Sequence, residues 1–372
     1  TIVDGSRWDA VKHFDIHTQQ DLSWNVRYLL PDFAKGGEGM INVGEYVGNK
    51  DELDAYSDHI YQANGGNKFI MGTFDFGFRA FNGGLKSMID GNGFFNMADL
   101  AGAQQNWRYT DIDNTRYHRT MPFVNNHDTY RPQVDASGNI IGWNNGQELS
   151  PHFDPGNSRL ALAYAAIMAI DGNPQIFFED LFNIYGTGKR YSHLPTSETD
   201  LPVNEGIKKL IWAHQVLDFK GGSYKIRTNA GGNPYFPGGS SANDLLAIER
   251  SGKAVIGLND NGGSWQSVWV DTDFNPGTVI KDYSGANGTA TYTVNNDKRI
   301  NVNTPPVDPA NGYYGYSIWA PVGFDASTFT PARTAVTTQE WEMANDLGDS
   351  HCLSLGYGGA LPANKTNQRI AG

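Results

Sequence analysis

Short apolar runs alternate with amphipathic stretches along the first 220 residues of the chain. The runs have the length and the β-rich composition of buried strands, and they lie at 2–9, 40–45, 69–75, 122–126 and 175–178. The clearest helical spacing of apolar residues lies at 50–63, 158–170 and 204–219. This alternation is typical of parallel strands joined by crossover helices, so the sequence predicts an α/β sheet or barrel.

The pattern changes after about residue 220. Short alternating runs separated by Gly, Asn and Asp follow at 244–249, 254–258, 267–270 and 313–319, which is typical of an antiparallel β-sandwich. The last stretch is polar and has few strand signals. We therefore predict three parts: an α/β catalytic part at 1–220, a β-sandwich domain at 221–322, and a linker or the start of a further module at 323–372.

Composition narrows the classes of function. The formal net charge of −12, without clusters of Lys and Arg, disfavours nucleic acid and anionic membrane surfaces as partners. Cys352 is the only cysteine, so the chain has neither an internal disulfide nor a thiolate zinc cage. The chain starts at Thr1 without Met and without a signal-peptide pattern, and we expect the natural N-terminus to lie upstream.

Three carboxylates stand at the C-terminal ends of predicted strands: Asp9, Glu45 and Asp128. In a parallel barrel these ends converge over the axis. Glycoside hydrolysis needs one carboxyl group to protonate the leaving oxygen and a second to attack the anomeric carbon or to activate water. Arg7 lies two residues before Asp9, on the same side of the strand, where its guanidinium can keep that carboxylate ionised. The pattern indicates acid/base chemistry.

Three motifs in this order carry a family resemblance. They are G-S-R-W-D-A-V-K-H at 5–13, G-E-Y at 44–46 and F-V-N-N-H-D at 123–128. They resemble the second, third and fourth signature regions of the α-amylase family of glycoside hydrolases (family 13), and G-N-P-Q-I-F-F at 172–178 resembles its last barrel strand. The resemblance implies a (β/α)8 TIM barrel followed by an antiparallel β-sandwich. The first three barrel strands would precede Thr1, so we expect this chain to hold only part of the barrel.

The resemblance also implies roles for individual residues. Asp9 would be the nucleophile, Glu45 the general acid/base and Asp128 the transition-state stabiliser. The implied substrate contacts are Arg7, Lys12, His13, Tyr46 and His127. The backbone carbonyl of His13 would also ligate a structural calcium ion. We therefore expect a secreted, extracellular enzyme that hydrolyses α-1,4-glucosidic bonds of starch- or glycogen-type polysaccharides internally, with retention.

Two alternatives stay open. A transglycosylase or an exo-acting α-glucosidase would use the same scaffold, because the acceptor is chosen by loops. A non-catalytic glucan-binding fragment is the other alternative, because a partial barrel can keep the acids without aligning them. The sequence does not indicate a chloride requirement or an oligomeric state.

Single residues outside the motifs have more ordinary explanations. We expect Asp75 to make a structural hydrogen bond rather than to act on substrate. The pair His13 and His17 has the spacing of a zinc-binding helix but lacks the accompanying Glu, so we do not predict zinc. We interpret the remaining tryptophans and acids as core residues and solvated loop residues, respectively: Trp24, Trp107, Trp143, Asp99, Asp111 and Asp113.

Overall fold

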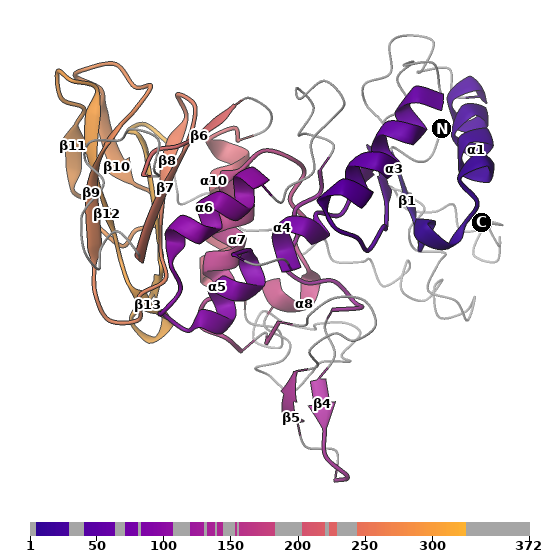
Figure 1. Ribbon diagram of the computed structural model, residues 1–372. Coiled ribbons are helices and arrows are strands. Elements are labelled where there is room, and N and C mark those ends of the chain that lie inside the picture. The colour runs from indigo at the N-terminus through magenta and orange to yellow at the C-terminus, as the bar shows by residue number, and fades with distance from the viewer. Residues whose placement is uncertain are drawn as a thin grey trace, which may run out of the picture.

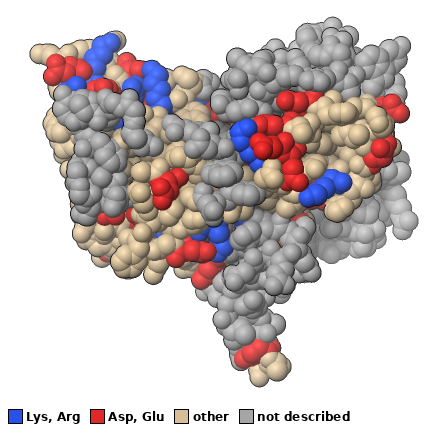
Figure 2. Space-filling model, in the orientation of Figure 1, with Lys and Arg blue, Asp and Glu red and all other residues tan. Residues whose placement is uncertain are grey.

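The structure is a computed structural model. In Figure 1 the strands of the C-terminal β-sandwich lie on the left and the N-terminal parallel strands lie on the right, with helices between them. It describes residues 5–29, 41–63, 71–80, 83–106, 120–129, 132–137, 140–143, 153–154, 156–182, 203–219, 223–228 and 244–324. The predicted linker or further module therefore lies almost wholly outside the described residues. On the face shown in Figure 2, the described Lys and Arg side chains lie in small groups beside Asp and Glu.

The first strands of the chain form a parallel sheet. Strands β1 (Gly5–Trp8), β2 (Ile41–Gly44) and β3 (Gly72–Thr73) pair in the order β1-β2-β3, and both pairs are parallel. Two single parallel bridges continue the succession, from Phe74 to Met121 and from Phe123 to Gln175. The last four of the five predicted strand segments thus each run parallel to the segment before them in the chain. Closure into a complete barrel stays a prediction.

The helices that follow these strands were largely predictable. Helix α1 (Ile16–Leu29) follows β1, and helix α3 (Lys50–Ala63) follows β2 with Asp51 and Glu52 in its first turn, where acids favour the helix dipole. The predicted helices at 158–170 and 204–219 form α7 (Leu160–Ala169) and α10 (Glu205–Val216). The other described helices are α4 (Phe76–Ala80), α5 (Leu85–Gly91), α6 (Met97–Asn106) and α8 (Phe178–Leu181). None of the described helices has the length and apolar character that crossing a membrane requires.

Two predicted strands are shorter than expected. Strand β3 covers only Gly72–Thr73, and α4 begins soon after it at Phe76. The predicted strand at 175–178 is wrong at its end, because Phe178 starts α8. The carbonyl of Phe177 accepts hydrogen bonds from the amides of Asp180 and Leu181, so the chain turns into a helix there. The described chain also has an outlying antiparallel hairpin, β4 (Pro132–Val134) and β5 (Ile140–Trp143).

The C-terminal part is antiparallel, as predicted. Six strands form one sheet in the order β11-β10-β15-β8-β7-β6. They are β6 (Tyr224–Ile226), β7 (Leu245–Arg250), β8 (Ala254–Asn259), β10 (Val279–Asp282), β11 (Thr291–Thr293) and β15 (Tyr316–Pro321). Two short pairs complete the domain: β9 (Gln266–Asp271) with β12 (Arg299–Thr304), and β13 (Val307–Asp308) with β14 (Tyr313–Tyr314). The predicted strand at 313–319 is split at Gly315, whose φ of 74° only glycine adopts readily.

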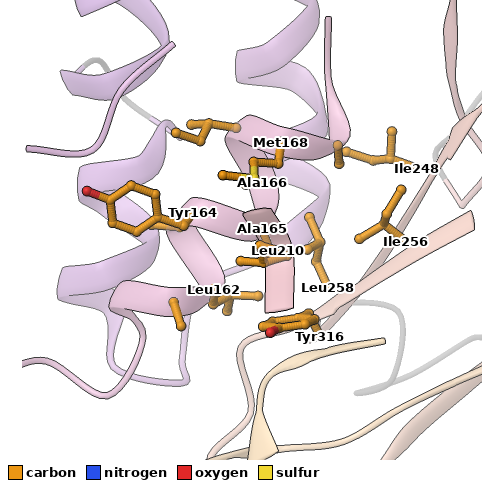
Figure 3. Packing of buried hydrophobic residues seen from close by; sticks show 14 of the residues in the cluster. Leu162, Tyr164, Ala165, Ala166, Met168, Leu210, Ile248, Ile256, Leu258 and Tyr316 are labelled. Atoms are coloured by element: carbon orange, nitrogen blue, oxygen red, sulfur yellow. The ribbon is translucent and has the colours of Figure 1, made fainter. Parts of the chain in front are cut away.

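The central strands β7, β8 and β15 of the six-stranded sheet are buried on both faces, and their packing fixes the sandwich to the helices. On one face Leu245, Val255 and Trp319 meet apolar residues of β9 and β12. On the other face Ile248, Ile256, Leu258 and Tyr316 pack on α7 and α10, as Figure 3 shows. The hydroxyl of Tyr316 donates to the carbonyl of Gly206 in α10 at 2.6 Å. Strands β7 and β8 therefore read as nearly continuous apolar runs.

The close approach of β8 to its neighbours makes a prediction about Gly257. A Cβ there would collide with Thr304 Oγ1 and would lie 2.7 Å from Ser317 Oγ. We expect Gly257→Ala to lower the free energy of unfolding by about 1–3 kcal/mol, measured as a lower urea midpoint. The control is Gly263→Ala, where the nearest atom is Asn261 Oδ1 at 3.9 Å. Equal midpoints for the two variants would contradict this packing.

Candidate active site

The guanidinium of Arg7 joins two carboxylates at the ends of β1 and β2. Its Nη1 lies 2.7 Å from Asp9 Oδ1 and its Nη2 lies 2.9 Å from Glu45 Oε1. Parallel pairing sets this geometry, because Arg7 is in register with Val43 and the pairing continues through the hydrogen bond from the Glu45 amide to the Trp8 carbonyl at 2.8 Å. Residues 36 positions apart, Asp9 and Glu45, are thus brought to one cation.

The two carboxylates differ sharply in exposure. The side chain of Asp9 is 71% exposed, whereas that of Glu45 is 8% exposed. Burial raises the pKa of Glu45, the hydrogen bond with Asp9 and the negative charge of Asp128 raise it further, and Arg7 and the Ala10 amide oppose these effects. The net direction is upward. Glu45 is therefore the member of the pair that holds a proton more readily.

Asp9 shifts the other way. The hydrogen bond with Glu45 lowers the pKa of Asp9 most, burial opposes it as the second-largest effect, and the interactions with Arg7 and His127 lower the pKa as well. At neutral pH the arrangement favours an ionised Asp9 beside a Glu45 whose proton is retained to higher pH. One carboxyl group is suited to donate a proton and its neighbour to attack or to accept one.

The third predicted acid, Asp128, lies in the loop after Phe123. Its Oδ2 is 3.2 Å from His127 Nε2, and its side chain is half-buried while that of His127 is exposed. The charge of Asp128 acts on Glu45 and that of His127 acts on Asp9. The structure thus brings the segments at 7–9, 45 and 127–128 to one place. Their catalytic roles remain predictions.

Three of the predicted substrate contacts, Lys12, His13 and Tyr46, lie next to the acids in the chain. Lys12 and His13 are exposed and belong to a short 3-10 helix, Val11–His13, directly after Asp9. The ammonium group of Lys12 lies 5.6 Å from the centre of the Tyr46 ring and donates to the Val47 carbonyl at 3.2 Å. Tyr46 packs against Tyr56 with 5.3 Å between ring centres. These residues flank the Arg7 pair without contacting it directly in any described hydrogen bond.

A calcium site at His13 would need further oxygen ligands beside the His13 carbonyl. Calcium takes six to eight oxygen ligands. In the described part of the chain no group of three or more His, Cys, Asp or Glu side chains is placed to hold a metal ion. The His13 carbonyl alone does not make such a site, so calcium at His13 stays a prediction and no step below depends on it.

Several residues with ordinary interpretations can also be placed. Asp75 is buried and its Oδ1 accepts the amide of Phe78 at 3.1 Å, so it caps α4 as a structural residue. Asp99 is exposed in the first turn of α6. The others fall outside the described residues or side chains: Trp24, Trp107, Asp111, Asp113 and Trp143.

One local device was missed from the sequence. Asn126 Oδ1 accepts the backbone amides of Asp128 at 3.0 Å and of Thr129 at 2.9 Å. An Asn that accepts from the amides two and three residues ahead fixes a tight turn. The Asn in N-H-D-T at 126–129 is a residue type that favours such turns, but we interpreted this segment only through its His-Asp pair.

Comparison with known proteins gives a family-model match in the C-terminal part of the chain and a similar fold over most of its length. A family model described as the α-amylase C-terminal domain matches residues 254–320. A γ-CGTase from Alkalophilic bacillus clarkii has a similar structure, with a TM-score of 0.55 and 18% identity over 86% of this chain and 40% of that chain. The maltogenic α-amylase AmyB from Thermotoga neapolitana gives 0.46 and 16% over 87% and 62%, and Eubacterium rectale Amy13B gives 0.46 and 15% over 87% and 60%.

The extent of these matches differs between the comparisons. The chain spans between 40% and 62% of the length of these three solved chains. The likeness to the first of them shows a shared fold. Comparison with curated proteins gave no match.

The ion pairs of Arg7 with Asp9 and Glu45 predict how both acids titrate when its charge is removed. Because Arg7 lowers the pKa of both Asp9 and Glu45, Arg7→Met should move both carboxyl titrations to higher pH. The measurement is a 13C NMR titration of side-chain carboxyls in Asp- and Glu-labelled protein. Lys12→Met removes a nearby charge that makes no described ion pair with either acid and should move both titrations less than Arg7→Met does. Unmoved titrations in Arg7→Met would contradict the bridge.

Proposed function

We propose that this chain carries the catalytic acids of a retaining α-glucan hydrolase, and the match of residues 254–320 to the α-amylase C-terminal domain supports this proposal. The proposed reaction is endo-hydrolysis of α-1,4-glucosidic bonds in starch- or glycogen-type polysaccharides. Because a polymer supplied from outside the cell is too large to diffuse across a membrane, we also propose an extracellular enzyme. The whole protein is the acting unit in this proposal.

One observation carries the proposal. Arg7 holds Asp9 and Glu45 at 2.7 Å and 2.9 Å while burial and exposure divide their protonation. A retaining mechanism starts from this pair of states, with one carboxylate ionised as nucleophile and one carboxylic acid ready to protonate the leaving oxygen. Without the guanidinium, two carboxyls this close would compete for a single proton.

In the first step Asp9 attacks the anomeric carbon and forms a glycosyl ester, while Glu45 gives its proton to the departing glycosidic oxygen. The C–O bond to the leaving sugar breaks as the bond to the Asp9 oxygen forms. Asp128 would stabilise the oxocarbenium-like transition state through the sugar hydroxyls, without bonding to the reacting carbon.

In the second step Glu45, now ionised, takes a proton from water as that water attacks the same carbon. The ester bond to Asp9 breaks, and Asp9 returns as a carboxylate. Two inversions leave the anomeric configuration unchanged. The sugars that flank the cleaved bond would be contacted by residues next to the acids in the chain: Lys12, His13, Tyr46 and His127.

A transglycosylase or an α-glucosidase on the same scaffold is the enzymatic alternative. It shares the first step, and it differs in the acceptor or in the end of the chain that is cut. Product analysis on starch separates the three activities: a ladder of oligosaccharides supports endo-hydrolysis, whereas glucose alone or transfer products support the alternatives.

The nucleophile assignment predicts a specific loss. Asp9→Asn keeps the shape of the side chain but removes the attacking charge, so turnover of soluble starch should fall by about 10³-fold or more, measured as reducing-sugar release. Retention of starch in an affinity gel should stay close to that of the unchanged protein. The matched control is Asp90→Asn, an exposed acid paired with Lys86 at 2.7 Å, which should keep full turnover.

Two outcomes would contradict this assignment. Near-normal turnover in Asp9→Asn would reject Asp9 as nucleophile. Starch binding without turnover in the unchanged chain would instead support the non-catalytic glucan-binding alternative.

A further inference from the structure

A buried hydrogen-bonded network lies directly behind the loop that carries Asp128. At its centre Asp180 in α8 is 2% exposed. Its carboxylate accepts two bonds from Asn125 Nδ2, at 3.3 Å and 3.1 Å, and one from the hydroxyl of Tyr164, at 2.7 Å. Tyr164 belongs to α7, and Figure 3 shows its ring pointing away from the sandwich strands. None of these residues was singled out by the sequence.

A second buried group holds the adjacent residue of the same segment. Arg79 is fully buried at the end of α4, and its Nε donates to the carbonyl of Val124 at 2.6 Å. Its guanidinium lies over the rings of Phe153 at 4.2 Å and Phe123 at 5.2 Å. Burial lowers the pKa of Arg79 to about 9, and its charge is attracted to Asp180. The backbone at Val124 is thus fixed from one side.

The next residues carry this constraint to Asp128. Asn125, Asn126 and Thr129 are all buried. The amide of Asn126 donates to Thr129 Oγ1 at 2.9 Å, and Asn126 Oδ1 accepts the amide of Asp128 at 3.0 Å. The side chain of Asp128 is 29% exposed, so it is where the buried turn meets the site. Val124 and Asn125 are thus hydrogen-bonded to residues of α4 and α8, and Asn126 is hydrogen-bonded to Asp128 and Thr129 within the turn.

We propose that Asp180 is a positioning residue for Asp128, acting through Asn125 and the buried turn at Asn126. The proposal rests on the proposed function, because it concerns the alignment of the predicted transition-state stabiliser. The carboxylate of Asp180 fixes the side-chain amide of Asn125, and Asn125 in turn fixes the register of the turn that carries Asp128.

Removing the carboxylate would leave donors unpaired in a dry interior. Asn125 Nδ2 and the Tyr164 hydroxyl both point at Asp180, and buried donors without acceptors are unfavourable. The segment can recover by shifting, and a shift moves Asp128 relative to Glu45. Because the charge of Asp128 raises the pKa of Glu45, any such movement is visible in the titration of Glu45.

The experiment compares Asp180→Asn with a matched buried control. Asp180→Asn keeps the shape but replaces one of the two accepting oxygens by an amide donor, which in either orientation faces Asn125 Nδ2. In 13C NMR of Glu-labelled protein, Glu45 should titrate at lower pH than in the unchanged chain. With a p-nitrophenyl maltooligosaccharide as probe, kcat should fall about 10- to 100-fold with KM within about twofold, and the alkaline limb of the pH profile should move to lower pH.

The control is Asp282→Asn in the sandwich domain. Asp282 is 3% exposed and accepts from Ser284, Asn287 and the Ile318 amide, so its loss is a comparable burial defect far from Asp128. It should leave the Glu45 titration and kcat unchanged. An unmoved Glu45 titration in Asp180→Asn would overturn the proposal, as would a change equal to that in Asp282→Asn.

Two further variants test the same proposal, and the first of them does so even if Asp180→Asn does not fold. Tyr164→Phe removes one of the three bonds to Asp180 and should shift the Glu45 titration less, in the same direction. A double variant with Asn125→Ala and Asp180→Asn should lose no more kcat than the more damaged single variant, because the two residues act in series; additive losses would contradict the series. The NMR titration does not depend on turnover, so an inactive unchanged chain rejects the proposed function while the Glu45 titration still decides this inference.

Discussion

The contact on which the rest of the site depends is the guanidinium of Arg7 between Asp9 and Glu45. Each carboxylate alone would be unremarkable, since one is exposed and the other buried. The hydrogen bond with Glu45 lowers the pKa of Asp9 most, whereas burial raises the pKa of Glu45 against the opposing charge of Arg7. The ion pairs with Arg7 hold the two carboxyl groups together, and their different burial separates their protonation.

That geometry depends in turn on the parallel order of the strands. Because β1 and β2 are neighbours in register, the residues after them leave the sheet at the same edge. The bridges from Phe74 to Met121 and from Phe123 to Gln175 bring the Asp128 loop to this edge from further along the chain. Helices α7 and α10 pack on the sandwich on one side, and Tyr164 of α7 points to the other side, toward Asp180 (Figure 3). The sandwich and the Asp128 loop are therefore anchored to the same helix.

The sequence predicts the elements whose signals are local. The helix at 50–63 is found with the predicted bounds, and Asn204 begins α10 as a cap by accepting the amides of Gly206 and Ile207. Strand ends were less predictable, because α4 and α8, which follow them, have only five and four residues and are too short to show a helical period. The buried charges were invisible for another reason: Arg79 and Asp180 read as surface residues until their partners, 45 and 55 residues away in the chain, are known. The gathering of Asp9, Glu45 and Asp128 at one place was predictable because their motifs occur together and in order.

The central claim is that Asp9 is the group that bonds to the sugar, and trapping that bond tests it most directly. The full chain carrying Glu45→Gln is incubated with a maltooligosaccharide fluoride, whose leaving group needs no protonation, and then digested for mass spectrometry. The account predicts one added glycosyl mass on the peptide that contains Asp9, and none when Asp9→Asn is also present. An adduct on the peptide that contains Asp128, or hydrolysis of the fluoride with inversion and no adduct, would contradict it.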